Sequence, residues 1–128
     1  MKAEFSTAWI ASSKARKQRK YARNAPLHIK AKMLGAHLSK ELRKKHKIRS
    51  VRIRTGDKVK IMRGSNRGKE GKVERVSIRR CSVFITGFDR IRADGTKALV
   101  AFHPSNMQIV QFGSTDRLRK IGKSREAG

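Results

Sequence analysis

The sequence predicts a small, mainly β protein: a closed or nearly closed barrel preceded by short helices in a basic N-terminal extension. Between residues 51 and 112, apolar residues alternate with polar ones in short runs, the period of half-buried strands. Turn residues separate these runs into about five strands, and an open sheet this small would leave unprotected edges. The first 50 residues are instead rich in Lys and Arg and poor in apolar residues.

The first 24 residues predict an extended basic arm without a core of its own. Lys and Arg crowd between residues 14 and 23. Because so few apolar side chains cannot offset the entropy of folding, we expect the arm to be ordered only on a partner. The predicted divisions of the chain are residues 1–24 for the arm, 25–50 for two short basic helices, 51–112 for the barrel and 113–128 for a basic C-terminal tail.

The two helices are predicted from their end signals. Asn24 suits a helix cap, Pro26 suits a first-turn position, and Gly35 ends the first helix. Ser39 is a good N-cap residue for the second helix, whose apolar positions include Leu38. Helices of about two turns are unstable alone in water, so both must dock on the barrel or on a polyanion.

The segment GDKVKIMRGSNRGKEGKVERV, residues 56–76, predicts a strand, a glycine-rich basic loop and a second strand. Gly64, Gly68 and Gly71 interrupt the alternating pattern, and glycine adopts backbone conformations with positive φ and lets another backbone approach closely. The segment therefore predicts a tight hairpin that presents cations. An ordinary hairpin with a solvated turn is the competing interpretation of the glycines alone.

The rest of the barrel is predicted from turn and spacing signals. Val73 and Val76 lie three residues apart, so we expect a bulge near Glu74 or Arg75 that bends the sheet. Turns are expected at Arg79-Arg80, at Asp94-Gly95, a strong hairpin signal, and at Pro104 to Asn106. The tail after residue 113 predicts one short basic helix, capped by Ser114 and ended at Gly122.

The charge indicates a polyanionic partner. The formal net charge is +25 over 128 residues, with 34 Lys plus Arg against 9 Asp plus Glu. An excess this large repels itself in a compact chain unless RNA, DNA or an anionic membrane screens it. The net charge is +15 in residues 1–55, +7 in residues 56–112 and +3 in residues 113–128. The excess is therefore densest outside the glycine-rich segment.

Composition also excludes several classes of protein. Cys81 is the only cysteine, which rules out an internal disulfide and a cysteine-based zinc site and favours a reduced, intracellular setting. No apolar stretch approaches the roughly 20 residues that span a bilayer, so membrane insertion is not expected. A secretory signal is not expected either, because the N-terminus has no continuous apolar region. The sequence indicates no cofactor and no small-molecule substrate.

The candidate binding residues are basic and polar side chains suited to RNA phosphates. Aromatic residues make up only 5% of the chain, so phosphate contact and RNA shape are favoured over base stacking. Arg63, Asn66, Arg67 and Lys69 form the expected contact edge of the hairpin, while the turn from His103 either touches RNA or merely closes the barrel. The candidates are Lys14, Arg16, Lys17, Arg19, Lys20, Arg23, His28, Lys30, Lys32, Lys40, Arg43, Lys44, Lys45, Arg49, Arg52, Arg54, Arg63, Asn66, Arg67, Lys69, Arg79, Arg80, His103, Ser105 and Asn106.

Other conspicuous residues have simpler interpretations. Asp57 follows a glycine at a strand start, where hydrogen bonding to nearby amides is favoured over metal binding. Only His37 and Glu41 have a helical four-residue spacing, and one such pair is too few ligands for a metal. Cys81 is interpreted as a packed or surface thiol. Trp9 is open to two interpretations, stacking on a base or packing on a neighbouring protein.

The hairpin resembles a KOW motif, and its flanks resemble one ribosomal family. The motif residues are Gly56, Asp57, Val59, a hydrophobic run, Gly64, Arg67-Gly68 and Gly71-Lys72-Val73. The flanks are NAPLHIKAKML (24–34), LSKELRKKHKIRSVRIRTGDKV (38–59) and DGTKALVAFHPSNMQIV (94–110). Together, from about residue 14 to about residue 122, they are similar to the archaeal and eukaryotic branch of a large-subunit ribosomal protein family. That family is numbered twenty-four in the bacterial scheme and twenty-six in the eukaryotic one.

The resemblance implies an SH3-like KOW barrel with a basic N-terminal helical extension. It implies a non-catalytic, cytoplasmic ribosomal protein that binds large-subunit rRNA near its 5′ domain and the peptide tunnel exit. An early role in assembly and neighbouring large-subunit proteins as partners are also implied. The first dozen residues do not match the family pattern, and the C-terminal tail is shorter than in the eukaryotic form.

Two other classes of function compete with this one. A KOW-type transcription-associated factor would need a further folded module, and residues 1–50 have too few apolar positions for one. An enzyme acting on nucleic acid would need paired carboxylates, a metal cluster or a nucleophile with a base, and the sequence shows none of these constellations.

Overall fold

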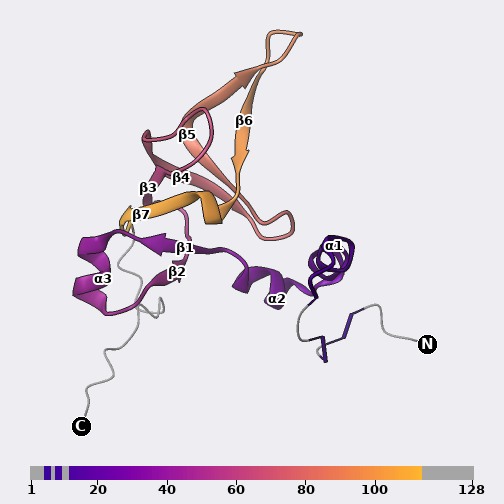
Figure 1. Cartoon of the computed structure of the whole chain (residues 1–128). Helices are drawn as coiled ribbons and strands as arrows, with labels where there is room; N and C mark the ends of the chain where they lie inside the picture. Colours follow the sequence, from indigo (N-terminus) through magenta and orange to yellow (C-terminus); the bar gives the residue numbers. More distant parts are fainter. Residues whose placement is uncertain (1–4, 7, 10–11, 114–128) are drawn as a thin grey trace.

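The computed structural model describes residues 5–6, 8–9 and 12–113, and it has the predicted mainly β architecture with short helices (Figure 1). Seven strands form one sheet in the order β2-β1-β7-β3-β4-β5-β6, which curls into a small SH3-like barrel. The elements are α1 (Ala15–Asn24), α2 (Leu27–Lys32), β1 (Gly35–Leu38), α3 (Lys40–His46), β2 (Ser50–Arg52), β3 (Lys58–Ile61), β4 (Glu70–Ser77), β5 (Ser82–Ile91), β6 (Lys97–Phe102), the 3₁₀ helix η1 (Pro104–Asn106) and β7 (Met107–Gln111).

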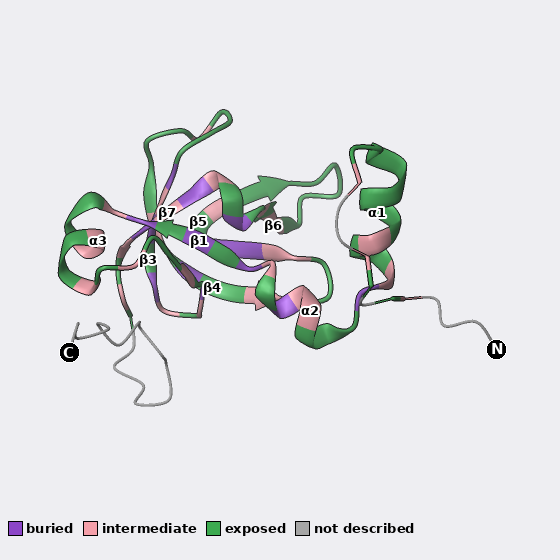
Figure 2. Cartoon of the chain, turned by 60° about the horizontal axis from the view of Figure 1, so that its bottom comes forward, coloured by how far each residue is buried: buried purple, intermediate pink, exposed green. Residues whose placement is uncertain are grey.

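The core consists of the inward-facing aliphatic side chains of the strands. Val59 and Ile61 of β3, Ile85 of β5 and Ile109 of β7 are at most 1% exposed. Burying one such side chain contributes about 1.5–3 kcal/mol. Buried positions concentrate in the barrel and are sparse in the helices (Figure 2), so the barrel supplies most of the hydrophobic stabilisation.

The β3–β4 hairpin forms as predicted, and Gly71 of β4 packs closely against side chains of β5. Lys58 pairs with Lys72, and Val59 pairs with Gly71, in antiparallel register. A Cβ on Gly71 would overlap the Ile85 Cγ2 atom and would lie 3.1 Å from Phe88 Cε2. Gly71 is therefore required sterically, since it lets β5 pack against β4.

The predicted irregularities of the sheet are confirmed. The β4–β5 register shifts between Val73 and Arg75, where a bulge was expected. The β5–β6 hairpin turns at Asp94-Gly95, and Gly95 has φ +87°. The Asp94 Oδ1 atom accepts hydrogen bonds from Thr96 Oγ1 at 2.7 Å and from the Thr96 N–H at 3.0 Å. These bonds favour the charged carboxylate, so the pKa of Asp94 lies below its usual 3.8.

Two expectations for the N-terminal half are wrong. Ala15–Asn24 is the helix α1 and not an extended arm, because its Ala, Arg, Lys and Gln residues have high helix propensity. As expected, α1 buries none of its own residues. Leu38 belongs to the strand β1 and not to the second helix, because β1 pairs antiparallel with β2 and parallel with β7. Tertiary pairing thus overrides the local pattern in β1.

The two short helices after α1 are present. Ser39 caps α3 as predicted, and its Oγ atom accepts a hydrogen bond from the Leu42 N–H at 3.4 Å. Asn24 was predicted to cap the first of these helices, and this prediction is wrong. Asn24 is the last residue of α1, and Pro26 occupies the N-cap position of α2. The predicted helix capped by Ser114 lies outside the described residues. Within the part of the chain that the structure covers, no helix combines the length and apolar character needed to cross a membrane.

Candidate nucleic-acid interface

The loop between β3 and β4 is held in shape by its own backbone. The Gly68 N–H donates to the Ile61 carbonyl at 2.8 Å, and the Ile61 N–H donates to the Lys69 carbonyl at 2.9 Å. Inside this closure the Arg67 N–H donates to the Gly64 carbonyl at 3.2 Å. Gly64 and Gly68 have φ values of +94° and +87°, which side-chain-bearing residues rarely adopt. The loop therefore has a defined backbone conformation.

The side chains of this loop face solvent. Arg63, Arg67 and Lys69 are exposed, whereas Asn66 is half-buried. The Lys69 ammonium donates to the Asn66 Oδ1 atom at 3.3 Å, so Asn66 positions one of the three cations. The loop therefore presents a cluster of cations on a fixed backbone, a suitable arrangement for phosphate groups.

The turn between β6 and β7 adjoins this loop. The Met62 N–H donates to the Asn106 carbonyl at 2.8 Å, which brings two segments far apart in the sequence to the same end of the barrel. The exposed side chains of His103 and Ser105 form a hydrogen bond, with Nδ1 and Oγ 2.7 Å apart. The turn is thus both a closure of the barrel and an exposed polar surface. We call residues 63–69 together with 103–106 the loop edge.

A second group of cations lies on α3, at the opposite end of β1 from α1 and α2 (Figure 1). Lys40, Lys44 and Lys45 are exposed, and Arg43 is half-buried. The His46 ring meets the Phe112 ring edge-on at a centroid distance of 5.3 Å, which places the end of α3 beside the end of β7. The loop edge adjoins the start of β7, so these two groups lie at opposite ends of that strand.

A third group combines α2 with the turn between β4 and β5. The Cys81 thiol lies 3.8 Å from the Lys30 carbonyl and 3.6 Å from the Ile78 carbonyl. Cys81 is half-buried with φ +50°, which agrees with the expectation of a packed or surface thiol. Its contact brings α2, which carries Lys30 and Lys32, next to the turn with Arg79 and Arg80. Sequence spacing alone did not predict this combination.

The helix α1 carries five Lys and Arg residues and no acidic residue. Arg16, Arg19, Lys20 and Arg23 are spaced by three or four residues, so they share one face of the helix, and all are exposed. On an adjacent face, Tyr21 stacks on Trp9 with the ring centroids 4.2 Å apart. Trp9 was conspicuous in the sequence, whereas Tyr21 was not among the predicted site residues. Tyr21 could have been found from the sequence, because it lies at helical spacing within the basic run.

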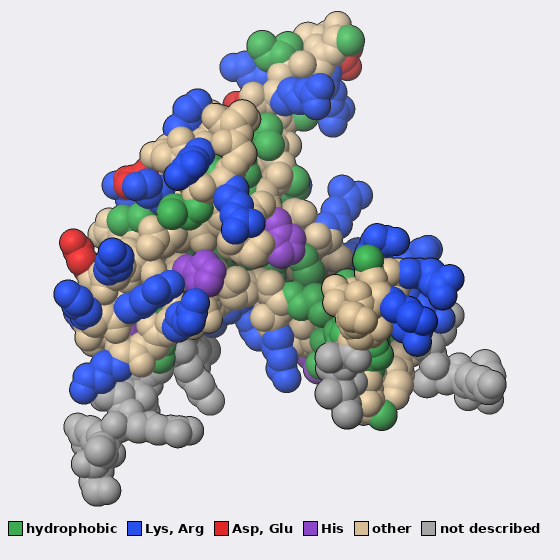
Figure 3. Space-filling view, in the orientation of Figure 1, with side chains coloured by type: hydrophobic (Ala, Val, Ile, Leu, Met, Phe, Trp, Pro, Cys, Tyr) green, Lys and Arg blue, Asp and Glu red, His purple; other side chains and the backbone are tan. Residues whose placement is uncertain are grey.

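None of the predicted contact side chains is buried. Lys30, Arg43, Arg54, Asn66 and Asn106 are half-buried, and all the other candidates are exposed. Lys and Arg side chains spread over one face from α3 across the barrel to α1, with few acidic groups among them (Figure 3). The candidates therefore do not form one compact pocket. They form separate basic groups on an extended surface.

Asp57 is structural, as predicted. It is fully buried, its Oδ2 atom accepts from the Arg54 N–H at 3.0 Å, and its Oδ1 atom accepts from the Gly113 N–H at 3.0 Å. The carboxylate thus ties the turn before β3 to the chain after β7. Among the residues that the structure describes, His, Cys, Asp and Glu side chains form no group of three that could hold a metal ion.

Comparison with known proteins agrees with these features. The model of the family that comprises the eukaryotic ribosomal proteins L26 and their archaeal L24 counterparts matches residues 12–122. The chain belongs to this family. The resemblance noted from the KOW motif and its flanks is confirmed, and as a member of the L26 family the chain is a protein of the cytoplasmic ribosome.

Two curated relatives are both named large ribosomal subunit protein uL24. The relative from Methanothrix thermoacetophila is 44% identical over 111 residues, which cover 87% of this chain and 96% of the relative. The relative from Korarchaeum cryptofilum is 45% identical over 111 residues, which cover 87% of this chain and 85% of the relative. The similarity to these two members of the L26 family therefore extends over nearly their whole length.

Proposed function

We propose that this chain is a structural, non-catalytic constituent of the large ribosomal subunit that binds large-subunit rRNA through its phosphate backbone. The observation that carries the proposal is the accessibility of the predicted contact side chains, none of which is buried, on a chain of net charge +25. Family membership supports the ribosomal setting.

The basic groups differ in what they offer to RNA. The loop edge has fixed backbone geometry, so it suits a defined arrangement of phosphates. The cations of α1 and α3 sit on helices outside the core, where long side chains can follow phosphates of neighbouring RNA strands. Phosphate contacts position a protein and carry no base information directly. We infer that RNA shape, presented to these separate groups, provides the specificity.

The place of binding is proposed from the family resemblance. We infer that the protein contacts rRNA near its 5′ domain, close to the exit of the peptide tunnel, beside neighbouring large-subunit proteins. An early role in subunit assembly follows from the same inference, because neutralising phosphates allows RNA helices to approach one another.

A salt titration against a large-subunit rRNA fragment tests the binding mode. Each phosphate contact contributes roughly 0.7–0.9 to the slope of log affinity against log salt concentration. With about ten contacts, a fourfold rise in salt should lower the affinity by about four to five powers of ten. The variant Lys44→Gln/Lys45→Gln should reduce the slope by about 1 for each phosphate that the replaced lysines neutralise.

Lys58→Gln serves as the matched control for the removal of a cation. Lys58 already pairs with Glu70 at 3.1 Å, so its replacement should leave the slope nearly unchanged. A wild-type slope shallower than about 3 would contradict backbone-dominated binding. Co-sedimentation with RNA polymerase rather than with the large subunit at moderate salt would contradict the ribosomal role.

A further inference from the structure

The N-terminal segment and α1 gather a group of aromatic rings outside the barrel. Phe5, Trp9 and Tyr21 are three of the seven aromatic residues in the chain. Trp9 and Tyr21 stack with an interplanar angle of 21°, and the Phe5 centroid lies 5.0 Å from that of Tyr21. All three rings are half-buried, so each keeps part of its surface open to solvent. We call these three residues the aromatic group.

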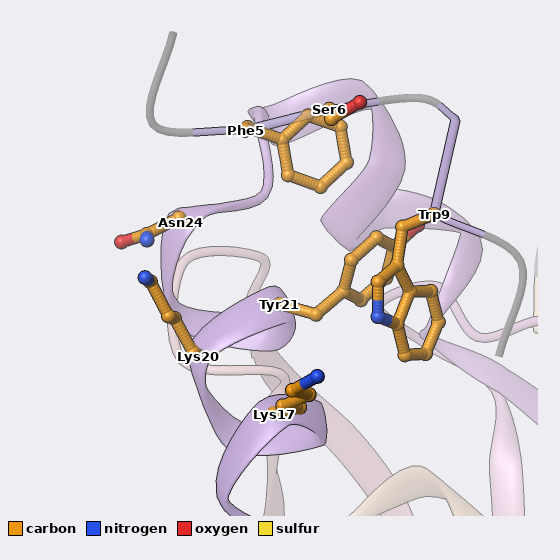
Figure 4. Close-up of a pocket in the computed structure, with 7 residues that line it drawn as sticks. All are labelled: Phe5, Ser6, Trp9, Lys17, Lys20, Tyr21 and Asn24. Atoms are coloured by element: carbon orange, nitrogen blue, oxygen red, sulfur yellow. The ribbon is translucent and has the colours of Figure 1, made fainter. Parts of the chain in front are cut away.

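A cleft is lined by the aromatic group, by Ser6 and by polar side chains of α1. Its volume is about 310 Å³, and the close-up in Figure 4 shows its lining residues. The helical contributors are Lys17, Lys20, Tyr21 and Asn24, which follow the i, i+3, i+4, i+7 spacing of a single helix face. The cleft is therefore built by one face of α1 together with Phe5, Ser6 and Trp9.

The chemistry of the cleft combines ring surface with positive charge. Lys17 and Lys20 are exposed at the cleft, and Asn24 adds an amide. The described residues up to Asn24 include no Asp or Glu, so no carboxylate neutralises these cations within this part of the chain. A ligand that fits has a flat π-surface for the rings and a nearby negative charge for the ammonium groups.

An unstacked nucleotide has both properties. Every base offers a π-face to aromatic side chains regardless of its identity, and its phosphate carries the charge. The cleft volume is at the lower end of the range for small-ligand sites, which suits one nucleotide better than a folded partner. Lysines are also depleted in the core of protein–protein interfaces, so Lys17 and Lys20 do not favour an apolar protein surface as the partner.

We propose that this cleft captures a single unstacked base of RNA, with its phosphate held by Lys17 and Lys20. The proposal rests on the proposed RNA binding and adds a stacking contact to it. It departs from the sequence expectation that phosphate contact and RNA shape are favoured over base stacking, because three of the seven aromatic residues gather at one place. It also gives Trp9 an RNA role and favours the first of its two interpretations.

Trp9 is the only tryptophan, so its fluorescence reports on this cleft alone. The full chain is titrated at moderate salt with an oligouridylate and with an abasic ribose-phosphate oligomer of the same length. Stacking of a base should quench Trp9 emission, whereas the abasic oligomer should bind without quenching it. Tyr21→Leu should weaken oligouridylate binding by about tenfold and leave abasic binding unchanged.

Two charge variants distinguish binding at the cleft from general electrostatic attraction between the basic protein and RNA. Lys17→Gln/Lys20→Gln should weaken the binding of both oligomers and reduce the quenching at saturation, because the phosphate no longer holds the base in place. The matched control Lys44→Gln/Lys45→Gln on α3 should weaken binding of both oligomers equally and leave the quenching at saturation unchanged. Equal quenching by the abasic oligomer, or equal affinity for the two oligomers, would overturn the base-capture proposal.

The remaining outcomes distinguish this proposal from the proposed function. Binding of the rRNA fragment without any change in Trp9 emission would overturn base capture and leave rRNA binding intact. Protection of Trp9 by a neighbouring protein in assembled subunits, with no effect of RNA, would assign the cleft to a protein partner instead. Failure to bind either oligomer or the rRNA fragment would overturn both proposals.

Discussion

At the scale of the residue, the glycines of the hairpin have different physical roles. Gly64 and Gly68 adopt positive φ with open space around the Cβ position, so their requirement is conformational. Gly71 has no such φ, but a Cβ there would overlap Ile85. The spacing of glycines in the sequence predicted a shaped loop, but it could not reveal that one of them is needed for packing between strands.

The steric role of Gly71 leads to a stability prediction. Gly71→Ala should lower the free energy of unfolding by about 1–3 kcal/mol, because β4 and β5 must move apart to admit the methyl group. Chemical denaturation measures this change. Gly35→Ala is the matched control, since its nearest neighbour, the Lys32 carbonyl oxygen, lies 4.0 Å from the Cβ position. Equal effects of the two substitutions would contradict the packing role.

Asp57 is a motif residue with a structural role, because its carboxylate holds two backbone segments together. Its two carboxylate oxygens accept backbone hydrogen bonds from residue 54, before β3, and from residue 113, after β7. Leaving a buried donor unsatisfied costs about 1–3 kcal/mol. The prediction of a hydrogen-bonding role followed from its place after a glycine, whereas the bond to Gly113 depends on the tertiary fold.

At the scale of the element, we expect the loop edge and the basic helices to contribute differently to RNA binding. The β3–β4 loop is closed by backbone hydrogen bonds and lies on the core-bearing barrel. In contrast, α1 has no buried residue, so its cations are not fixed by the core. We expect the loop edge to set the orientation of the protein on the RNA and the helices to supply most of the attraction.

Replacing Arg63, Asn66, Arg67 and Lys69 together with alanine tests this division. The quadruple variant should lose more affinity for cognate rRNA than for random RNA of equal length, by roughly tenfold or more in the ratio, if each specific hydrogen bond that it removes is worth about 1 kcal/mol. Competition binding at fixed salt measures that ratio.

Arg16→Gln/Arg19→Gln/Arg23→Gln on α1 removes the same number of cations as the quadruple variant. This control should weaken binding to cognate and random RNA about equally. Equal losses for the two RNAs in the loop variant would contradict an orienting role for the loop edge.

Local signals predicted the elements that depend on local physics. The β3–β4 hairpin, the bulge after Val73, the Asp94-Gly95 turn and the Ser39 cap all follow from neighbouring residues. The strand β1 was missed because four residues carry too short a pattern, and its partners, β2 and β7, are set by the tertiary fold. The helix α1 was missed because low hydrophobicity was weighed above helix propensity.

At the scale of the whole molecule, a small core supports a large positive charge. The barrel buries the core, while net charge is concentrated in the N-terminal half of the sequence. Self-repulsion between the basic groups opposes compaction until a polyanion screens it. We therefore expect RNA binding and the ordering of α1, which buries no residue, to be coupled.

The sequence predicted which residues lie on the candidate surface, but it did not predict which of them lie close together in space. Composition indicates which side chains remain accessible, since Lys and Arg are rarely buried. Which of them lie together depends on contacts such as Met62 to Asn106 and Cys81 to Lys30, which join segments far apart in sequence. The stacking of Trp9 on Tyr21 likewise joins residues that are twelve positions apart in the sequence.

A crosslinking map of the protein on assembled large subunits tests the central claim most directly. We predict rRNA crosslinks from α1 and α3 as well as from the loop edge, because all three present exposed cations. Crosslinks confined to the barrel, with α1 free in solvent, would contradict the proposed binding mode.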